Sequence, residues 1–312
     1  MDHHQPRRPR TEDAAAIHEL ISARDIAAVG HPDMTLNDVT DELAEPGFDL
    51  DRDGWLWQDE DGRLVAWAWA SRKGDSDLVD IEVIERPGTQ GERTATLWST
   101  VLERARELAE EAGHQGATVD IGVYRTDEPQ RALAQAHGFE PSTSFHRLRV
   151  DHDGPVEAPQ PPEGLTLHVG VTDEVRREAH AIHQKGFADH FGFVPLTYDE
   201  WYTRKQTQST TDWSQLTVAR IDGEPAAMLV GANHFVPDEN CGYVATLATL
   251  PEHRGRGLGR FLLRTAFAAD AARGRKGTVL HVDANNTTPA LDLYQSVGMR
   301  PVLVIDVWRR RV

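Results

Sequence analysis

Two spacings of apolar residues alternate along the chain. Runs in which most residues, or every second residue, are apolar predict strands, and apolar residues three or four positions apart predict helices. The first half reads as helix, helix, three strands, helix, strand, helix and strand, at residues 12–28, 36–43, 55–58, 63–71, 78–84, 94–112, 117–123, 128–137 and after Gly138. Strands that alternate with helices in this way are typical of an α/β fold.

The second half repeats this order. Its strands are expected at residues 165–169, 216–221, 226–234, 243–250, 278–282 and 302–309, and its helices at 173–186, after Thr197, after the glycine-rich turn near 257, and at 289–297. A shift of 160 residues places Gly138 on Gly298 and Pro141 on Pro301. We interpret the two halves as a tandem duplication of one α/β unit.

A linker is expected between the copies. Residues 151–163 are acidic, rich in proline and without periodicity, which is typical of a semi-rigid linker. The expected domains are therefore residues 1–150 and 164–312, and a chain of 312 residues is long enough for two cores. The expected fold class is α/β (α+β), with two tandem domains that each have a mixed central sheet flanked by helices.

One stretch of the second half, residues 242–272, carries the clearest chemical signal. An apolar strand ends at Pro251, glycines alternate with arginines in the following turn, and helical spacing begins after it. The glycines allow positive φ and close approach of a ligand, and a helix N-terminus offers unpaired N–H groups to an anion. The pattern predicts a phosphate-binding turn, although a plain basic turn would also fit. It is neither GxxxxGK[ST] nor GxGxxG, which excludes a P-loop and a dinucleotide fold.

The two copies differ at this turn. The first copy has residues 85–92 in its place, without the same spacing of arginine and glycine. It also has Ala134 where the second copy has Tyr294. We therefore expect the first domain to be structural, or at most a degenerate ligand pocket.

The spacing Arg254-x-x-Gly257-x-Gly259 after a strand resembles the pyrophosphate loop of the GNAT superfamily of acetyl-CoA-dependent N-acetyltransferases. The segment from Asn286 to Met299 resembles the family pattern N-x-x-A-x-x-L-Y-x-x-x-G-F, with one extra residue after the asparagine and Met in place of Phe. The tyrosine of that pattern is in register with Tyr294. The tandem layout resembles two-domain actinobacterial acetyltransferases of the mycothiol synthase type.

The resemblance implies acetyl-CoA as cosubstrate and a set of binding residues. Backbone groups of three strand residues would hold the thioester, N–H groups of the turn would hold the pyrophosphate, and an asparagine would add a contact: Leu247, Ala248 and Thr249; Arg254, Gly255, Arg256, Gly257, Leu258 and Gly259; and Asn286. Tyr294 would donate a proton to the departing thiolate, since a phenol has a pKa near 10. The alternative for Tyr294 is packing of its helix on the sheet.

The sequence leaves the general base open. Many GNAT enzymes have a glutamate eight residues before the proline that ends the strand, and here that position is Tyr243. Glu239 and His190 are the first candidates, with Asp238 and His234 as further ones. Each could take the amine proton directly or through a water, and each could equally be a surface charge or a hydrogen-bonded polar residue.

The acceptor side is expected along residues 186–202. Its candidate walls are His190, Phe191, Phe193, Tyr198 and Trp201, with Asp189 and Asp199 as partners for an ammonium group. Three aromatic residues of this stretch have the spacing of core residues, and for them we expect a place in the core: Phe187, Phe191 and Trp201.

Composition narrows the remaining functions. The net charge of −17 argues against nucleic-acid binding, and no run of apolar residues is long enough to predict a membrane span. Cys241 is the only cysteine and the N-terminal residues do not resemble a signal peptide, so we expect a cytoplasmic protein, as a monomer or a homodimer. No metal-binding motif is present, and no metal is expected.

The predicted function is transfer of an acetyl group from acetyl-CoA to the primary amine of a small molecule, by direct attack in a ternary complex in the second domain. No covalent intermediate is expected, because Cys241 lies at a strand start and not beside a His/Asp pair. Two alternatives stay open: acetylation of a cysteinyl-sugar amine, as by mycothiol synthase, and a non-catalytic CoA-binding module.

Overall fold

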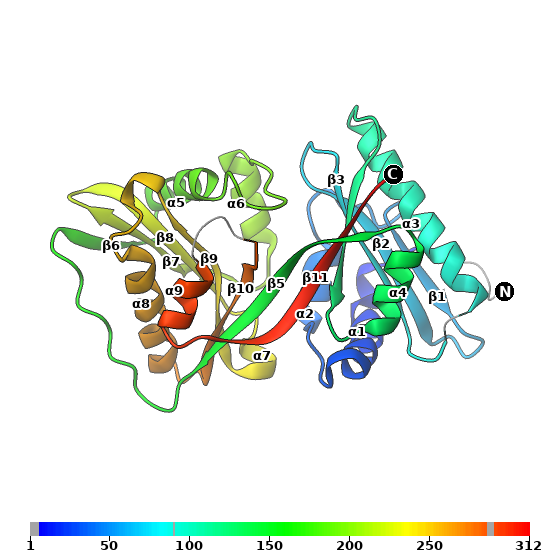
Figure 1. Cartoon of the computed structure of the whole chain (residues 1–312), viewed down its shortest axis with the longest axis horizontal. Coiled ribbons are helices and arrows are strands. Elements are labelled where there is room, and N and C mark those ends of the chain that lie inside the picture. The colour runs from blue at the N-terminus through cyan, green and yellow to red at the C-terminus, as the bar shows by residue number, and fades with distance from the viewer. Residues whose placement is uncertain (1–5, 90, 286–289) are drawn as a thin grey trace. The chain divides into compact units, whose positions relative to one another are not determined.

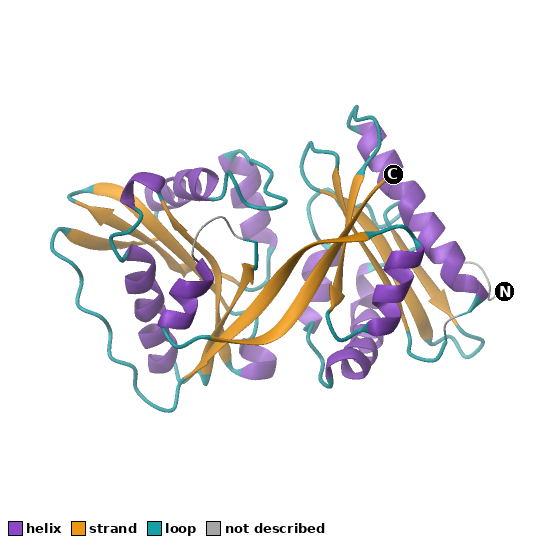
Figure 2. Ribbon diagram, viewed as in Figure 1, coloured by secondary structure: helices purple, strands orange, loops and turns teal. Residues whose placement is uncertain are grey.

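The computed structural model describes residues 6–89, 91–285 and 290–312 (Figure 1). The chain divides into two compact units. Unit 1 consists of Met1–Ser144 together with Ile305–Val312, and unit 2 consists of Phe145–Val304. Each unit has a mixed sheet with helices on both of its faces (Figure 2).

The sheet of unit 1 has the strand order β1-β2-β3-β4-β11. Neighbouring strands are antiparallel except β3 and β4, which are parallel. Helices α1 and α2 pack on one face around Ile17 and Val39, and α3 and α4 pack on the other around Trp98 and Ala134. Its elements are η1 (Thr11–Asp13), α1 (Ala14–Val29), α2 (Leu36–Leu43), β1 (Gly54–Gln58), β2 (Leu64–Arg72), β3 (Leu78–Glu85), α3 (Glu92–Glu111), β4 (Thr118–Tyr124), α4 (Glu128–Ala136) and parts of β5 (Glu140–Asp151) and β11 (Arg300–Arg311).

The sheet of unit 2 has the order β5-β10-β9-β8-β7-β6, in which only β9 and β10 are parallel among the described pairs. Helices α5 and α6 cover one face around Ile182 and Trp201, and α8 and α9 cover the other around Phe261 and Tyr294. Its further elements are β6 (Leu165–Val169), α5 (Asp173–Gly186), α6 (Tyr198–Thr207), β7 (Thr211–Ile221), β8 (Glu224–Ala232), α7 (Val236–Glu239), β9 (Cys241–Thr249), η2 (Pro251–His253), α8 (Leu258–Ala272), β10 (Gly277–Asp283) and α9 (Ala290–Ser296).

Two strands are exchanged between the halves of the sequence. Residues 145–151 of β5 pair antiparallel with β10 in unit 2, and residues 305–311 of β11 pair antiparallel with β4 in unit 1. Both segments contribute to the cores, because Leu148 is fully buried in unit 2 and Trp308 is buried in unit 1. The units therefore differ from the expected ranges 1–150 and 164–312 in these two segments. Local periodicity cannot reveal the exchange, since strand pairing depends on residues far apart in the sequence.

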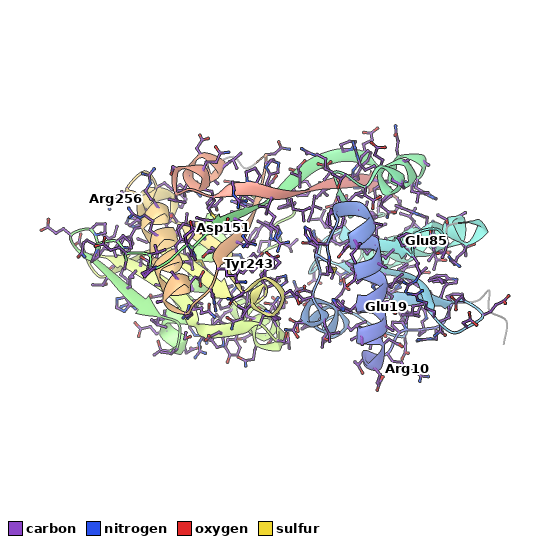
Figure 3. The ribbon with its side chains drawn as sticks, turned by 90° about the horizontal axis from the view of Figure 1, so that it is seen from below. Arg10, Glu19, Glu85, Asp151, Tyr243 and Arg256 are labelled. Atoms are coloured by element: carbon purple, nitrogen blue, oxygen red, sulfur yellow. The ribbon has the colours of Figure 1, made fainter. Side chains whose placement is uncertain are left out.

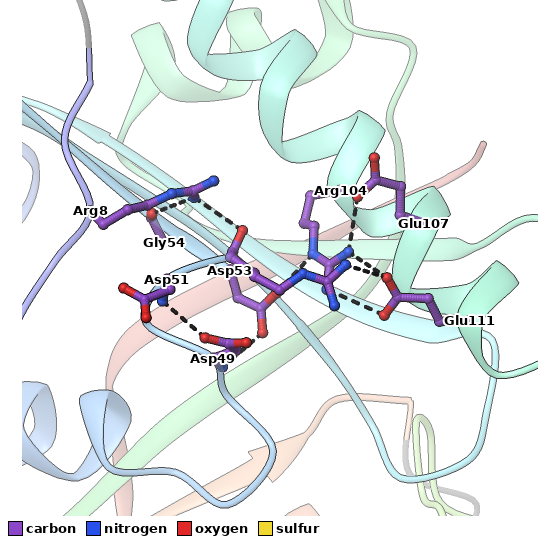
Figure 4. A network of polar contacts seen from close by, with 9 residues as sticks. Arg8, Asp49, Asp51, Asp53, Gly54, Arg104, Glu107 and Glu111 are labelled. Atoms are coloured by element: carbon purple, nitrogen blue, oxygen red, sulfur yellow. Dashed lines mark hydrogen bonds and ion pairs between the residues drawn. The ribbon is translucent and has the colours of Figure 1, made fainter.

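A buried polar network joins α3 to the start of β1 in unit 1 (Figure 4). Arg104 donates hydrogen bonds to Asp53 (2.8 Å), Glu107 (2.9 Å) and Glu111 (2.9 Å). Asp53 also accepts the backbone N–H of Asp49 at 2.8 Å. Because the buried guanidinium is met by carboxylates and the buried carboxylate by two donors, the network is satisfied internally and its role is structural.

Most elements begin and end within a few residues of the predicted positions. Strand β7 begins at Thr211 rather than 216, because Thr211 pairs with Ala232 beyond an irregular stretch of the ladder. Helix α7 was not predicted, since four residues are too few for a periodic signal. Of the expected linker, residues 151–163, the first residue is the end of β5, and residues 152–163 form neither helix nor strand. Within the described ranges, no helix is long and apolar enough to cross a lipid bilayer.

Candidate active site

The parallel strands β9 and β10 separate in the middle of unit 2. Their pairing ends at Val244 with Leu280, although both strands continue. On its other side β9 stays paired with β8 as far as Thr249, and an extra residue in β9, Ala245, forms a bulge where the separation begins. The facing edges of β9 and β10 therefore present backbone N–H and C=O groups that an extended ligand can pair with, as an added strand would.

The turn after β9 leads directly into α8. Gly255 and Gly257 have φ values of 76° and 79°, a conformation that strongly favours glycine. Gly259 serves another purpose: a Cβ there would lie 3.0 Å from Leu293 of α9, so the glycine lets the two helices approach each other. The first hydrogen bond of α8 runs from the N–H of Phe261 to the C=O of Gly257 (3.0 Å). The N–H groups before Phe261 are the orphan donors of a helix N-terminus, which favours an anion.

The arginines of the turn have different environments. The guanidinium of Arg254 donates to the C=O groups of Thr249 (3.3 Å) and Gly186 (3.4 Å), so it joins the end of β9 to the end of α5. The backbone N–H of Arg254 is also used, in a hydrogen bond within the turn. Arg260 lines the cavity described next, whereas Arg256 is exposed on unit 2 (Figure 3).

The separated strands, the turn and α9 surround a cavity of about 690 Å³ in unit 2. This volume lies in the range of small-molecule sites. Eight of the predicted cofactor-binding residues line it: Leu247, Ala248, Thr249, Arg254, Gly255, Gly257, Leu258 and Gly259. Arg256 is not among its lining residues, and Asn286 lies outside the described residues.

Tyr294 lines the same cavity from α9. Its ring packs in the core cluster with Leu280 and Val282 of β10. Burial raises the pKa of the phenol to about 12, so Tyr294 is protonated at neutral pH and has a proton to give. The corresponding residue of the first copy, Ala134, is fully buried in the core of unit 1.

The loop after α5 forms another wall of the cavity. His190, Phe191 and Phe193 all line it. Burial lowers the pKa of His190, which keeps its imidazole mainly neutral at pH 7. Phe187, expected in the core, both packs against the core around α5 and lines the cavity, and Phe145 of the exchanged strand β5 lines it as well.

Two of the aromatic residues expected as walls of the acceptor side lie elsewhere. Trp201 is buried in the core between α5, α6 and the sheet. Tyr198 donates a hydrogen bond to Asp173 (2.6 Å) at the start of α5. Neither is among the residues that line the cavity, because both belong to α6, whose apolar side packs on α5 and the sheet.

Glu239 is held by two arginines of β5. Arg147 donates to its Oε1 atom, and Arg149 donates to its Oε2 atom at 2.9 Å. In the described part of the chain, the cavity lining contains neither Glu239 nor the other upstream candidates, Asp238 and His234. The structure therefore brings His190, but not Glu239, into the cavity with Tyr294. The arginines come from the exchanged strand, which is why the sequence did not reveal this ion pair.

Among the further polar residues that line the cavity, two lie on β10 and are not predicted from the sequence. His281 and Asp283 lie two positions apart near the end of β10. The Nδ1 atom of His281 is 3.2 Å from the phenol oxygen of Tyr243. Tyr243 occupies the sequence position at which the family commonly has its glutamate. The available signal was a polar residue at alternate positions of an otherwise apolar strand, because such residues share one face.

Among the described residues, no group of three or more His, Cys, Asp or Glu side chains is placed to hold a metal ion. The polar groups that line the cavity include backbone groups, arginines, histidines, the phenol of Tyr294 and the carboxylate of Asp283.

Comparison with known proteins gives consistent results. The sequence model of the acetyltransferase (GNAT) family matches residues 176–299. The mycothiol acetyltransferase of Thermobispora bispora is 30% identical over 242 residues, which cover 75% of this chain and 77% of the relative. That of Clavibacter michiganensis subsp. michiganensis is 30% identical over 259 residues, which cover 81% of this chain and 78% of the relative.

Solved structures share the fold over the whole chain. A GCN5-related N-acetyltransferase from Sphaerobacter thermophilus has a TM-score of 0.82 at 24% identity, covering 100% of this chain and 96% of that one. A tandem GNAT protein from the clavulanic acid biosynthesis pathway has a TM-score of 0.73 at 18% identity, covering 98% and 97%. These likenesses confirm the predicted fold class, and the two relatives at 30% identity show the family. The chain is therefore an acyltransferase of the GNAT family.

Proposed function

We propose that unit 2 transfers an acetyl group from acetyl-CoA to the primary amine of a small molecule, by direct attack within a ternary complex. One observation carries the proposal: a single cavity is lined by a glycine-rich turn at a helix N-terminus, by two separated strand edges and by a buried phenol. The turn suits the diphosphate of the coenzyme, the strand edges suit its amide-containing arm, and the phenol suits its thioester.

Binding would rest mainly on backbone groups. The first-turn N–H groups of α8 at Leu258 and Gly259 would hold the diphosphate, with Arg254 and Arg260 adding charge. Backbone groups of residues 247–249 would pair with the extended arm and place an N–H donor at the acetyl oxygen. Asn286 stays a candidate contact, and Arg256, which is exposed, would act through its charge alone.

The chemistry needs two proton transfers. The neutral amine attacks the acetyl carbon, a C–N bond forms and the C–S bond breaks, while the amine loses a proton and the sulfur gains one. Tyr294 would supply the proton to the sulfur, because its phenol is protonated at neutral pH. Of the two leading candidates for the base, His190 lines the cavity. Glu239 would first have to leave Arg147 and Arg149.

A narrower function is favoured by the relatives alone. The mycothiol acetyltransferases match at 30% identity over most of the chain, which supports the amine of a cysteinyl-sugar conjugate as the acceptor. The replacement of the strand glutamate by Tyr243 argues for a different proton-accepting group.

We assign unit 1 a structural role. Among its described residues, the first copy lacks both the arginine–glycine turn and the phenol.

The single cysteine, Cys241, is buried and unpaired, which fits a reducing compartment such as the cytoplasm.

The test uses the full chain with acetyl-CoA and a panel of primary amines that includes glucosamine and its cysteinyl conjugate. Mass spectrometry follows the gain of one acetyl group, which avoids interference from an acceptor thiol. Tyr294→Phe should lower kcat by about 100- to 1,000-fold, because the proton donor is lost. Calorimetry should show acetyl-CoA affinity within about twofold of the parent, since the ring is kept.

Tyr202→Phe is the matched control, because Tyr202 stacks on Trp213 and is not among the described residues that line the cavity. If the parent protein binds acetyl-CoA but acetylates no amine of the panel, a non-catalytic CoA-binding module is the correct description. If Tyr294→Phe keeps full turnover, the acid is another residue.

A further inference from the structure

We propose that His281 is the general base of the reaction and that Tyr243 positions its ring. The proposal rests on the acetyl transfer proposed for unit 2 and assigns its proton-accepting step to a residue of β10. His281 belongs neither to the glycine-rich turn nor to the family pattern. It becomes a candidate because it lines the cavity and contacts Tyr243.

His281 and Tyr294 both line the cavity, and their side chains belong to opposite faces of the sheet. Side chains alternate along β10, so Leu280 and Val282 share the face on which Tyr294 packs, whereas His281 shares the other face with Val279. An acetyl carbon between the separated strands would then have the phenol on one side and the imidazole on the other. Amine addition could then use a proton acceptor on one side of that carbon, and thiolate departure a proton donor on the other.

The ring of His281 is oriented by its neighbours. Its Nδ1 atom is 3.2 Å from the phenol oxygen of Tyr243, which belongs to the adjacent strand β9. When Nδ1–H donates to that oxygen, Nε2 carries the lone pair and is the nitrogen able to accept a proton. A base held in one tautomer by a second group is the usual arrangement around an activated nucleophile.

The imidazole of His281 is unprotonated before the reaction begins. Burial first, and then the charges of Arg147 and His234, lower the pKa of His281 to about 3. The imidazole is therefore neutral at neutral pH, and its lone pair is available without prior loss of a proton. It cannot remove a proton from a free ammonium ion, so the amine has to arrive neutral and lose its proton as the C–N bond forms.

The other candidates are less well placed. Glu239 is paired with two arginines and does not line the described cavity. His190 lines the cavity, but it lies on a loop with its ring against Phe187 (4.3 Å between centroids), and no described side chain fixes its tautomer through a hydrogen bond. A strand residue keeps its position better than a loop residue, which favours His281.

The proton balance is complete. As the amine nitrogen bonds to the acetyl carbon, one N–H proton passes to Nε2 of His281. As the C–S bond breaks, the phenol proton of Tyr294 passes to the sulfur of CoA. The imidazolium then loses its proton to solvent and the phenolate gains one, so the products are the amide and free CoA thiol, and both side chains return to their starting states.

The test compares His281→Gln, Tyr243→Phe and their double variant, with His168→Gln as a matched control on the edge strand β6. Thiol release from acetyl-CoA is measured with the fastest thiol-free amine of the panel, and separately with water as the only acceptor. His281→Gln should lower kcat by about 100- to 1,000-fold with acetyl-CoA affinity within twofold. Tyr243→Phe should lower kcat by about tenfold, and the double variant should be no slower than His281→Gln, because Tyr243 acts through His281.

A second measurement separates catalysis from folding. In His281→Ala, added imidazole should restore part of the thiol release, which a purely structural role would not allow. If His281→Gln stays within threefold of the parent while Tyr294→Phe is impaired, or if His190→Gln shows the larger loss, the assignment of His281 is wrong and acetyl transfer stands. A parent protein that binds acetyl-CoA but releases thiol with neither acceptor contradicts the proposed function, and this proposal with it.

Discussion

The two units contain the same separation of parallel strands and use it differently. In unit 1 the pairing of β3 with β4 ends at Ile81 with Ile121, as the pairing of β9 with β10 ends in unit 2. In unit 2 a cavity lies at the separation. In unit 1 the chain satisfies the exposed edge itself: the side-chain amide of Gln130 donates to the C=O of Val83 at 2.9 Å.

Charged and polar side chains contact one another beside this separation in unit 1. Arg24 of α1 pairs with Asp25 (3.0 Å) and lies over the ring of Tyr124 at 4.9 Å from its centroid. The phenol of Tyr124 donates to Asp25 (3.2 Å) and Asp33 (3.0 Å). Burial raises the pKa of Glu82 nearby to about 7. The separation of the strands therefore belongs to the fold, and the side chains decide whether it is open to a ligand or closed.

The largest expected effect tests which unit each exchanged strand completes. Trp308→Ala should cost about 3–5 kcal/mol and Leu148→Ala about 2–5 kcal/mol, because both remove buried side chains. Hydrogen exchange should become faster in β4 of unit 1 for Trp308→Ala and in β10 of unit 2 for Leu148→Ala. Val302→Ala is the control on β11, since Val302 is 42% exposed. If Trp308→Ala makes hydrogen exchange faster in β10 alone, the assignment of β11 to unit 1 is wrong.

The next effect compares the turns of the two copies. Gly257 and Gly88 have φ values of 79° and 81°, so valine at either position costs about 1–2 kcal/mol of stability. Gly257→Val should also weaken acetyl-CoA binding by about 100-fold, or ~2.7 kcal/mol, because it distorts the N-terminus of α8. Gly88→Val should leave affinity within twofold in calorimetry. Equal losses for the two variants would mean that unit 1 also binds the coenzyme.

The smallest effect concerns the group that closes the strand separation. Ala290 corresponds to Gln130 in the repeat and lines the cavity of unit 2. Ala290→Gln should place an amide where the coenzyme arm would pair and weaken acetyl-CoA binding by about tenfold, whereas Ala290→Ser should change it little. The reciprocal Gln130→Ala should cost unit 1 about 0.5–1.5 kcal/mol through the lost hydrogen bond, measured by thermal unfolding. Unchanged affinity in Ala290→Gln would show that the arm follows another path.

The features that the sequence predicts are those determined by nearby residues. The turn at residues 254–260 follows from the spacing of glycine and arginine, whose conformations depend on a few neighbours. Helices and strands follow from periodicity for the same reason. The contacts of Glu239 cannot be predicted in this way, because its partner Arg147 is 92 residues away in the sequence and belongs to an exchanged strand. The role proposed for His281 cannot be predicted from nearby residues either, because it depends on a contact with Tyr243, which lies 38 residues earlier on a neighbouring strand.

The strand exchange also sets an order of maturation during synthesis. Residues paired between β4 and β11, such as Tyr124 and Ile305, are 181 positions apart. At a translation rate of about 5–20 residues per second, the edge of β4 waits roughly 10–40 s for its partner. During that interval an apolar edge is open to unwanted pairing with other nascent chains. Unit 1 therefore leaves the ribosome first but is completed last. A translational pause or a premature stop near the end of the mRNA would leave unit 1 incomplete before it affected the cavity of unit 2.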